Sequence, residues 1–318
     1  MQVLTDLMSH LWMMGRQNRR APSAVIPALF PTQTPFLTQL GAARPDYSIH
    51  GKTALITGAS RGIGRAIALA LADHGARCLV LVARDGQRLA QVATEVEQRG
   101  AKVVLLPLDL TQPVAVNVAI AQAWQQHGPI HLLVNCAGVA HQAPFLQTSL
   151  HQVQAELDTN LLGLYTITRL VARRMVVRRE GCIINVSSLM GKVAAPTMAT
   201  YSATKFAILG FTQALRGELA PHRVRVVALL PSLTETDMVR GLSRFRGVQS
   251  TPPDRVAAAL LRGLGQGQTE ILVGWQSQWA VLAQRWMPNL VERLVRWASP
   301  KLSAPRPPRP AAIHPQEG

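Results

Sequence analysis

Six short, almost unbroken runs of apolar residues recur along the middle of the chain. They begin near positions 53, 78, 102, 132, 182 and 224. Buried parallel strands have this character, because helices cover both faces of their sheet. Segments with apolar residues at helical spacing separate the runs, at 65–74, 87–98, 114–126, 153–178 and 202–219. Strands that alternate with helices predict an α/β fold built on a doubly wound parallel sheet.

The length and the composition place this sheet in one domain with an extension at each end. The chain has 318 residues, of which 48% are apolar and 16% charged, as in globular proteins. We expect a single Rossmann-type domain over 47–274, preceded by an extension over 1–46. Amphipathic helices over 275–298 and a Pro-rich, disordered tail over 299–318 should follow it.

The extension begins with apolar residues at helical spacing between Val3 and Trp12, followed by Arg16, Arg19 and Arg20. This pattern predicts a short amphipathic helix and then a linker over 21–46. The helix is too short to span a bilayer and lacks the basic start of a secretory signal. We expect a cytoplasmic protein; a transit peptide for an organelle and a peripheral membrane anchor both stay open.

The segment after Gly274 is rich in tryptophan. One residue in three or four is large and apolar, and Pro288 predicts a break into two helices. Two interpretations stay open: helices packed on the core or on a second subunit, and a stripe that binds a membrane surface. The apolar positions are Trp275, Trp279, Leu282, Trp286, Leu290, Leu294 and Trp297, with Arg285, Arg293 and Arg296 off the stripe.

The formal net charge is +16, and most of it lies between residues 51 and 270. Such a surface suits an anionic partner: a phosphorylated cofactor, an acidic carrier protein or anionic lipid. We expect no nucleic-acid partner, because no known binding module is present. The three cysteines, Cys78, Cys136 and Cys182, are scattered, so we expect buried free thiols and no metal site.

The sequence TGASRGIG follows the first predicted strand and opens the first predicted helix. Glycines at this place allow a tight turn, close approach of a pyrophosphate, and close packing of the helix on the strand. The helix N-terminus then offers free N–H groups to phosphate. We therefore expect a dinucleotide site that includes Gly58, Ser60, Arg61, Gly62, Ile63 and Gly64.

The end of the second strand indicates which dinucleotide binds. NAD-binding chains place an acid there for the ribose hydroxyls, whereas this chain has Ala83 followed by Arg84. Arg61 and Arg84 could together bind a 2′-phosphate, which favours NADPH over NAD. The alternative is that both arginines are only solvated, and the neighbouring Asp85 weakens the argument.

Tyr201 and Lys205 lie one helical turn apart in YSATK. An ordinary exposed helical pair is the alternative to a catalytic one, because so short a motif also arises by chance. An ammonium about 4 Å away stabilises a phenolate by roughly 4 kcal/mol at an effective dielectric of 20. Burial opposes ionisation. We expect the ammonium to prevail and the pKa of Tyr201 to fall below its ordinary value of about 10.

With these motifs the chain resembles the short-chain dehydrogenase/reductase family from about Tyr47 to Met238. The resemblance rests on TGASRGIG, NCAG, DTNLLG, NVSS, YSATK and PSLTETDM, which occur in the family's order and spacing. It implies a catalytic set of Asn160, Ser188, Tyr201 and Lys205. Ser188 is preferred to Ser187 because the family's serine stands thirteen residues before the tyrosine.

The resemblance also implies further cofactor contacts. Asn135, Ala137 and Gly138 would line the adenosine side, Asp109 would meet the adenine, and Thr236 would hold the nicotinamide amide. Tyr201, Lys205 and Pro231 would contact the nicotinamide half. Two departures stand out: NCAG replaces the usual NNAG, and Pro231–Ser232 replaces Pro-Gly.

The resemblance implies reduction of a ketone to an alcohol. In the family's 3-oxoacyl-ACP reductases an arginine at the position of Arg179 docks the acidic acyl carrier, while the second docking position is His222 here, beside Arg223. A 3-oxoacyl thioester is therefore the first candidate substrate, although these arginines could instead be a solvated helix end. A lipophilic ketone of steroid or retinoid type is the second, and a non-catalytic dinucleotide-binding regulator the third. A homo-oligomer, and 238–249 as a lid over the substrate, are also expected.

Overall fold

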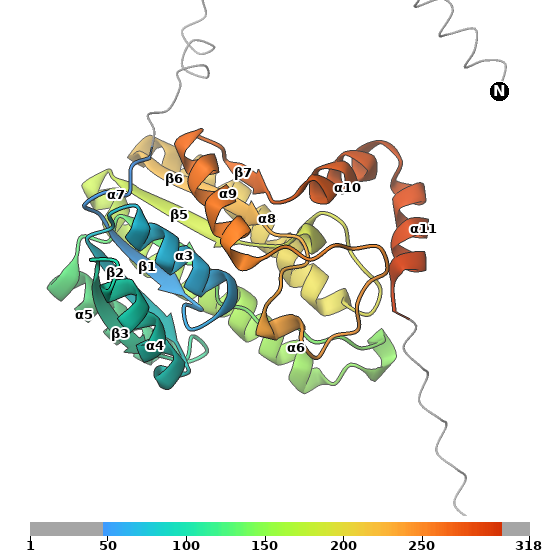
Figure 1. The fold of residues 1–318 in the computed structure, drawn as a ribbon, viewed down its shortest axis with the longest axis horizontal. Coiled ribbons are helices and arrows are strands. Elements are labelled where there is room, and N and C mark those ends of the chain that lie inside the picture. The colour runs from blue at the N-terminus through green and yellow to red at the C-terminus, as the bar shows by residue number, and fades with distance from the viewer. Residues whose placement is uncertain (1–46, 301–318) are drawn as a thin grey trace, which may run out of the picture. The chain divides into compact units, whose positions relative to one another are not determined.

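A seven-stranded parallel sheet forms the centre of the protein. The computed structural model describes residues 47–300. The strand order is β3-β2-β1-β4-β5-β6-β7 (Figure 1). This order confirms the doubly wound fold. The strands are β1 (Thr53–Thr57), β2 (Cys78–Ala83), β3 (Lys102–Pro107), β4 (Leu132–Asn135), β5 (Gly181–Val186), β6 (Val224–Leu230) and β7 (Glu270–Leu272).

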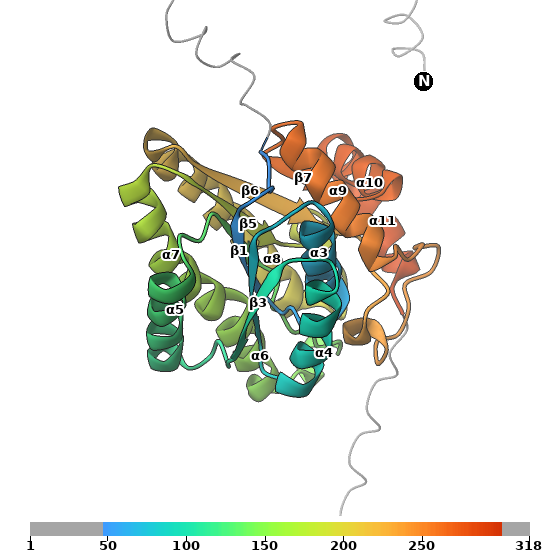
Figure 2. The ribbon, with the colours of Figure 1, turned by 60° about the vertical axis from the view of Figure 1, so that its left-hand side comes forward.

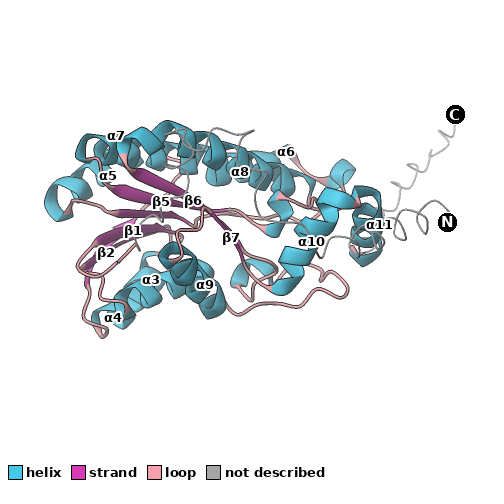
Figure 3. Ribbon diagram, turned by 90° about the horizontal axis from the view of Figure 1, so that it is seen from above, coloured by secondary structure: helices cyan, strands magenta, loops and turns pink. Residues whose placement is uncertain are grey.

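Helices cover both faces of the sheet, as the apolar strands predict (Figures 2 and 3). On one face, α3 (Gly62–Asp73), α4 (Gly86–Glu97) and α9 (Pro253–Gly265) enclose one buried apolar cluster. On the other, α5 (Pro113–His127), α7 (Leu164–Arg178) and α8 (Ala199–Leu219) enclose a second. The central strands β1, β4 and β5 are buried along their whole length, which explains their lack of polar alternation.

The helix expected over 153–178 is divided in the structure. It consists of α6 (Leu150–Leu157), a π-helical turn at Asp158–Gly163 (η2), and α7. Helix α9 was not predicted. Strand β7 was also missed, because it has only three residues. Short 3₁₀ turns complete the fold at η1 (Phe145–Gln147), η3 (Leu189–Gly191), η4 (Ala220–His222) and η5 (Asp237–Val239).

The C-terminal segment forms two helices, α10 (Trp275–Trp286) and α11 (Pro288–Ala298), so the predicted break at Pro288 is confirmed. The predicted N-terminal amphipathic helix and nearly all of the Pro-rich tail lie outside the described residues, and the predicted domain boundaries stay predictions. Among residues 47–300, no helix is long and apolar enough to cross a membrane. The three cysteines are free, and Cys78 and Cys182 are buried.

A buried chain of polar side chains joins the middle of the sheet to the helices beside it. The Asn135 amide donates to Thr168 Oγ1 (2.8 Å) and to Asn185 Oδ1 (2.8 Å). The Asn185 amide donates to Thr212 Oγ1 (2.9 Å), and Thr212 donates to the Ile208 carbonyl. These bonds fix the ends of β4 and β5 against α7 and α8, because a buried polar group is costly to leave without a partner.

Replacing Asn185 with alanine should destabilise the fold by about 1–3 kcal/mol, because it leaves buried groups on Asn135 and Thr212 without partners. Urea denaturation followed by circular dichroism measures the change. Asn117→Ala, at an exposed position on α5, is the matched control and should change the free energy of unfolding by less than about 0.5 kcal/mol. Equal losses in the two variants would contradict the assigned role.

Candidate active site

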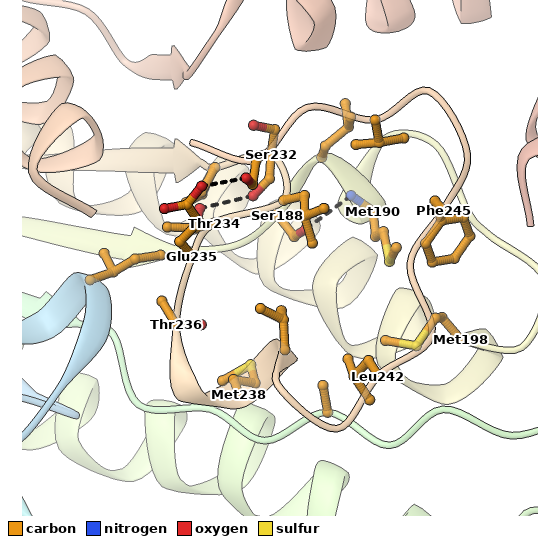
Figure 4. Close-up of a pocket in the computed structure, with 18 of the residues that line it drawn as sticks. Ser188, Met190, Met198, Ser232, Thr234, Glu235, Thr236, Met238, Leu242 and Phe245 are labelled. Atoms are coloured by element: carbon orange, nitrogen blue, oxygen red, sulfur yellow. Dashed lines mark hydrogen bonds between the residues drawn. The ribbon is translucent and has the colours of Figure 1, made fainter. Parts of the chain in front are cut away.

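A cavity of about 910 Å³ lies beyond the carboxyl ends of β5 and β6. Open α/β sheets bind ligands at this edge. The loop after β6 runs round the cavity from Ser232 and Thr236 to Leu242 and Phe245 (Figure 4). The other walls come from the segment after β5, from Tyr201 on α8, and from α11. Most of the lining is apolar, including Met190, Val193, Met198, Met238, Leu242 and Phe245.

The glycine-rich turn between β1 and α3 has the predicted shape. Gly58 and Gly62 have φ of +68° and +55°, which favours glycine. A Cβ on Gly64 would lie 2.2 Å from the Gly58 carbonyl oxygen, so helix and strand pack too closely for any other residue. Within the described chain no side chain caps the N-terminus of α3. Its N–H groups therefore suit the phosphates of a dinucleotide.

The loop after β6 contacts this glycine-rich turn. A Cβ on Gly62 would lie 2.8 Å from Thr236 Cγ2. Thr236 therefore lies against the glycine turn, beside the place where the pyrophosphate is expected. Ile63 lines the cavity, as does Pro231, whose carbonyl accepts a hydrogen bond from Leu189 N (2.8 Å).

An arginine cluster surrounds Asp237 at this junction. Arg88 Nη1 lies 2.7 Å from the carboxylate, Arg240 Nη1 3.0 Å and Arg61 Nη1 3.7 Å. The hydrogen bond from Arg88 holds the pKa of Asp237 below its ordinary value. Arg88 is a basic residue that the sequence analysis missed, whereas the predicted Arg84 is exposed at the end of β2.

Asp85 has a structural role here. It caps α4 by accepting a hydrogen bond from Arg88 N (3.0 Å), and its other carboxylate oxygen lies 3.4 Å from Arg88 Nε. Asp85, the acid next to Arg84, is therefore the N-cap of α4 and also holds the Arg88 side chain in place.

Two adjacent serines after β5 point in different directions. Ser187 is buried and donates to the carbonyl of Lys205 (2.8 Å). Ser188 begins η3, accepts a hydrogen bond from Met190 N (3.1 Å), and reaches Tyr201. The Ser187 hydroxyl is therefore occupied in holding α8 to the sheet, and the catalytic role of Ser188 stays a prediction.

Lys205 is 5% exposed and lies beneath Tyr201. Its Nζ donates to the Val186 carbonyl (3.1 Å) and lies 5.4 Å from the centre of the Tyr201 ring. A Cβ added to Gly138 would lie 3.6 Å from the same Nζ. The ammonium therefore faces the loop after β4 as well as the tyrosine.

Asn160 is fully buried in the π-helical turn. Its Oδ1 accepts from Val139 N (2.8 Å), and its Nδ2 donates to Val139 O (3.0 Å) and Thr204 Oγ1 (3.1 Å). The side chain thus ties the loop after β4 to α8 next to Lys205. Such π turns are frequent at functional sites.

The prediction that Lys205 lowers the pKa of Tyr201 is wrong for this structure. Burial raises the pKa of Tyr201 to about 12, although the hydrogen bond with Ser188 opposes the rise. Burial also lowers the pKa of Lys205 to about 8. Desolvation therefore has the largest effect on both groups, and Tyr201 is a neutral phenol at neutral pH.

A buried acid beside these residues was missed by the sequence analysis. Glu156, on α6 one turn before Asn160, is 1% exposed. It accepts a hydrogen bond from His141 N (2.6 Å) and lies 3.3 Å from His141 Nδ1. Burial raises the pKa of Glu156. A carboxylate so close to the site opposes ionisation of Tyr201 and favours the charged form of Lys205.

The side chain of Asn135 is occupied within the fold. Its side chain is 2% exposed and held in the polar chain between β4, β5 and α7, so only its backbone is left for an adenosine contact. Ala137 and Gly138 follow it in the loop after β4, and Ala137 N donates to Thr57 Oγ1 (3.1 Å). Asp109 lies just after β3 and accepts from Thr111 N (2.9 Å). Ser60 is partly exposed in the glycine turn.

The family model for the short chain dehydrogenase matches residues 52–247, which is more than half of the chain. The chain belongs to the short-chain dehydrogenase family. It is therefore an NAD(P)-dependent oxidoreductase of the dehydrogenase/reductase type. The match begins just before β1 and ends in the loop after β6, so it contains the glycine turn and the Tyr201–Lys205 pair.

Similar proteins include reductases of ketoacyl substrates. Ketoacyl reductase HetN from Nostoc sp. is 32% identical over 79% of this chain and 90% of its own length. The 3-oxoacyl-[acyl-carrier-protein] reductase FabG from Aquifex aeolicus is 36% identical over 62% of this chain and 80% of its own. A solved short chain dehydrogenase from Burkholderia cenocepacia, in complex with NADP, is 31% identical over 78% of this chain and 99% of its own, with a TM-score of 0.69.

The residues of this short-chain dehydrogenase fit a dinucleotide on structural grounds. The free N-terminus of α3 and the positive φ of Gly58 and Gly62 provide a phosphate cradle. Arg61 and Arg88 lie beside it. The cavity continues from Gly62 and Ile63 to Ser188 and Tyr201.

Because the pKa of Lys205 is lowered, the free energy of unfolding should depend on pH. Between about pH 8 and pH 10 the folded chain has lost a proton that the unfolded chain still holds, so the free energy of unfolding rises with pH. Between about pH 8 and pH 10, the free energy of unfolding of the native protein should rise by roughly 2–3 kcal/mol relative to that of Lys205→Met. Urea denaturation at pH 7, 8, 9 and 10 measures it.

Lys102→Met, at an exposed position on β3, is the control, and its difference from the native protein should stay constant with pH. A constant difference for Lys205→Met as well would mean that Lys205 keeps an ordinary pKa, contrary to its burial.

Proposed function

We propose that the protein reduces a ketone to an alcohol with NADPH. The observation that carries this proposal is the neutral phenol of Tyr201, with the Ser188 hydroxyl beside it and the Lys205 ammonium beneath it, in the wall of an apolar cavity. A carbonyl that accepts a hydride needs a proton donor within hydrogen-bond reach. A phenol with a raised pKa carries that proton at neutral pH.

NADPH would be held by the glycine turn, by Thr236 over that turn, and by Arg61 and Arg88. When bound, it supplies the hydride. Arg61 and Arg88 would bind the 2′-phosphate through charge-assisted hydrogen bonds, in place of or together with the Asp237 carboxylate. The exposed Arg84 could join them. This arrangement favours NADPH over NADH, because NADH has no phosphate for the guanidinium groups.

Tyr201 would donate its proton to the carbonyl oxygen, and Ser188 would donate a second hydrogen bond to the same oxygen. The phenolate left on Tyr201 would lie above the buried ammonium of Lys205, which stabilises it electrostatically. Asn160 would keep the loop after β4 in position behind Lys205. The attraction between ammonium and phenolate is strongest once charge has formed, so it acts on the transition state more than on the free protein.

The substrate we favour is a 3-oxoacyl thioester. Its support is the relatives named as ketoacyl reductases and the methionine-rich cavity, which suits an acyl chain. A lipophilic ketone of steroid or retinoid type is the second candidate, since α11 contributes apolar Val295 and Ala298 to the same cavity.

An acyl carrier protein is a possible source of that thioester, but docking at Arg179 raises a geometric difficulty. Arg179 donates to the Pro221 carbonyl (2.8 Å) and lies just before β5, near His222 and Arg223. Ser188 lies beyond the other end of β5, whose six residues alone span about 20 Å. Docking there would serve the site of a second copy more readily than the site of the same chain.

We also propose a homo-oligomer, with α7 and α8 at its interface. Tyr165 on α7 and Phe206 on α8 are large and exposed, as is Leu162 in the π-helical turn just before α7.

Tyr201→Phe should lower kcat for ketone reduction by at least 100-fold, because it removes the proton donor. Ser188→Ala should lower kcat by about 100-fold. NADPH oxidation measured with a panel of 3-oxoacyl thioesters and lipophilic ketones tests both variants. Fluorescence titration with NADPH shows whether the cofactor still binds.

Tyr165→Phe removes a hydroxyl from a half-exposed tyrosine outside the cavity and should leave kcat unchanged. If the native protein binds NADPH and oxidises none of it across the panel, the non-catalytic interpretation is favoured and the proposed reaction is wrong.

Arg61→Ala and Arg88→Ala should each raise KM for NADPH by about tenfold or more, with KM for NADH changed far less. Arg99→Ala is the matched control, since Arg99 lies just beyond the C-terminal end of α4 and pairs with Asp73. Equal effects on both cofactors would show that these arginines do not bind the 2′-phosphate.

A further inference from the structure

Helices α10 and α11 carry a continuous series of large, exposed apolar side chains. On α10, Trp275, Trp279, Leu282 and Trp286 lie within an arc of about 60° at 3.6 residues per turn. They are 63%, 64%, 48% and 74% exposed. On α11, Leu290, Leu294 and Trp297 form a second stripe, 46–65% exposed, and Met287 joins the two at the turn. We call these eight residues the tryptophan face.

The opposite sides of the same helices are fixed to the rest of the protein. Ser277 on α10 and Val291 on α11 are buried, and Val295 and Ala298 line the cavity. The two helices are therefore docked through one side only. The interpretation of packing on the core holds for that side. Among residues 47–300, nothing covers the tryptophan face.

Both helices also hold the loop that surrounds the cavity. Gln276 on α10 accepts from Gln249 N (3.2 Å) and donates to the Gly247 carbonyl (3.3 Å). Arg246 N donates to the Ala298 carbonyl at the end of α11 (2.8 Å). The two helices that carry the tryptophan face are therefore tied to the loop that lines the cavity.

The charges around the tryptophan face indicate what covers it. Arg285, Arg293 and Arg296 are exposed on the two helices and lie off the apolar stripes, and Glu292 is the one acid within 275–298. Tryptophan combined with arginine on an amphipathic helix is typical of the interface between lipid headgroups and acyl chains. The net charge of +16 adds a general attraction to anionic lipid.

We propose that the tryptophan face docks the protein on the surface of an anionic phospholipid bilayer. The tryptophan and leucine side chains enter the boundary between headgroups and acyl chains, and the three arginines contact the phosphates. The helices lie on the membrane and do not cross it. The cavity wall formed by Val295 and Ala298 would then adjoin the bilayer, so a lipid-dissolved substrate could reach the cavity without crossing water. The docking itself does not depend on the proposed reaction.

Flotation with vesicles tests the docking on the full chain. The native protein should float with vesicles of phosphatidylcholine and phosphatidylglycerol (70:30) and bind pure phosphatidylcholine more weakly. Trp275→Ser/Trp279→Ser/Trp286→Ser should weaken binding to the anionic vesicles at least tenfold. Arg285→Gln/Arg293→Gln/Arg296→Gln should weaken binding to the anionic vesicles by about fivefold for each arginine at low salt, with much less change for pure phosphatidylcholine.

Val114→Ser/Val118→Ser/Val177→Ser is the matched control, since these residues are exposed and apolar on α5 and α7; it should float like the native protein. Circular dichroism and NADPH binding show that each variant is folded. Failure of the native protein to float, or equal flotation of the tryptophan variant, overturns the proposal. So does a dimer that the tryptophan variant alone converts to monomer without any vesicle binding, which would assign the face to a second copy.

Discussion

The site depends on a positive charge held inside the protein. Lys205 is almost fully buried, and the atom that receives a hydrogen bond from its ammonium is the carbonyl of Val186, the last residue of β5. Burying an ammonium is costly, and its pKa falls to about 8 as a result. Two nearby groups offset part of this cost. The Val186 carbonyl accepts a hydrogen bond from the ammonium, and the buried carboxyl of Glu156 favours its charged form. The polar chain from Asn135 to Thr212 keeps β5 and α8 in register so that this contact persists.

The same burial makes Tyr201 and Lys205 differ more in proton affinity than they would in water. A phenol with a pKa of about 12 keeps its proton, and an ammonium with a pKa of about 8 is still charged at neutral pH. Tyr201 therefore keeps its proton until a nearby group accepts it. Environments that separate the pKa values of neighbouring groups are typical of acid–base sites.

Much of this could be predicted from the sequence, because it depends on local pattern. Near-continuous apolar runs predicted β1 to β6. The choice of Ser188 came from the family resemblance and stays a prediction; the structure adds that the Ser187 hydroxyl bonds to the Lys205 carbonyl. The pKa of Tyr201 could not be predicted, because it depends on how completely the folded chain excludes water. Arg88 and Glu156 were missed for a related reason. Arg88 contacts Asp237, which lies 149 positions later in the sequence. Glu156 is buried in the folded protein, but the pattern of residues in its helix does not indicate this.

The wall that α11 adds to the cavity comes from a part of the chain remote from the candidate catalytic residues. Ser188, Tyr201 and Lys205 all precede β6, whereas Val295 and Ala298 come after the last strand. The segment beyond Gly274 can therefore vary in length and composition without disturbing the sheet that holds the reacting groups. A substitution confined to this terminal segment would change the apolar wall of the cavity and leave Ser188, Tyr201 and Lys205 in place.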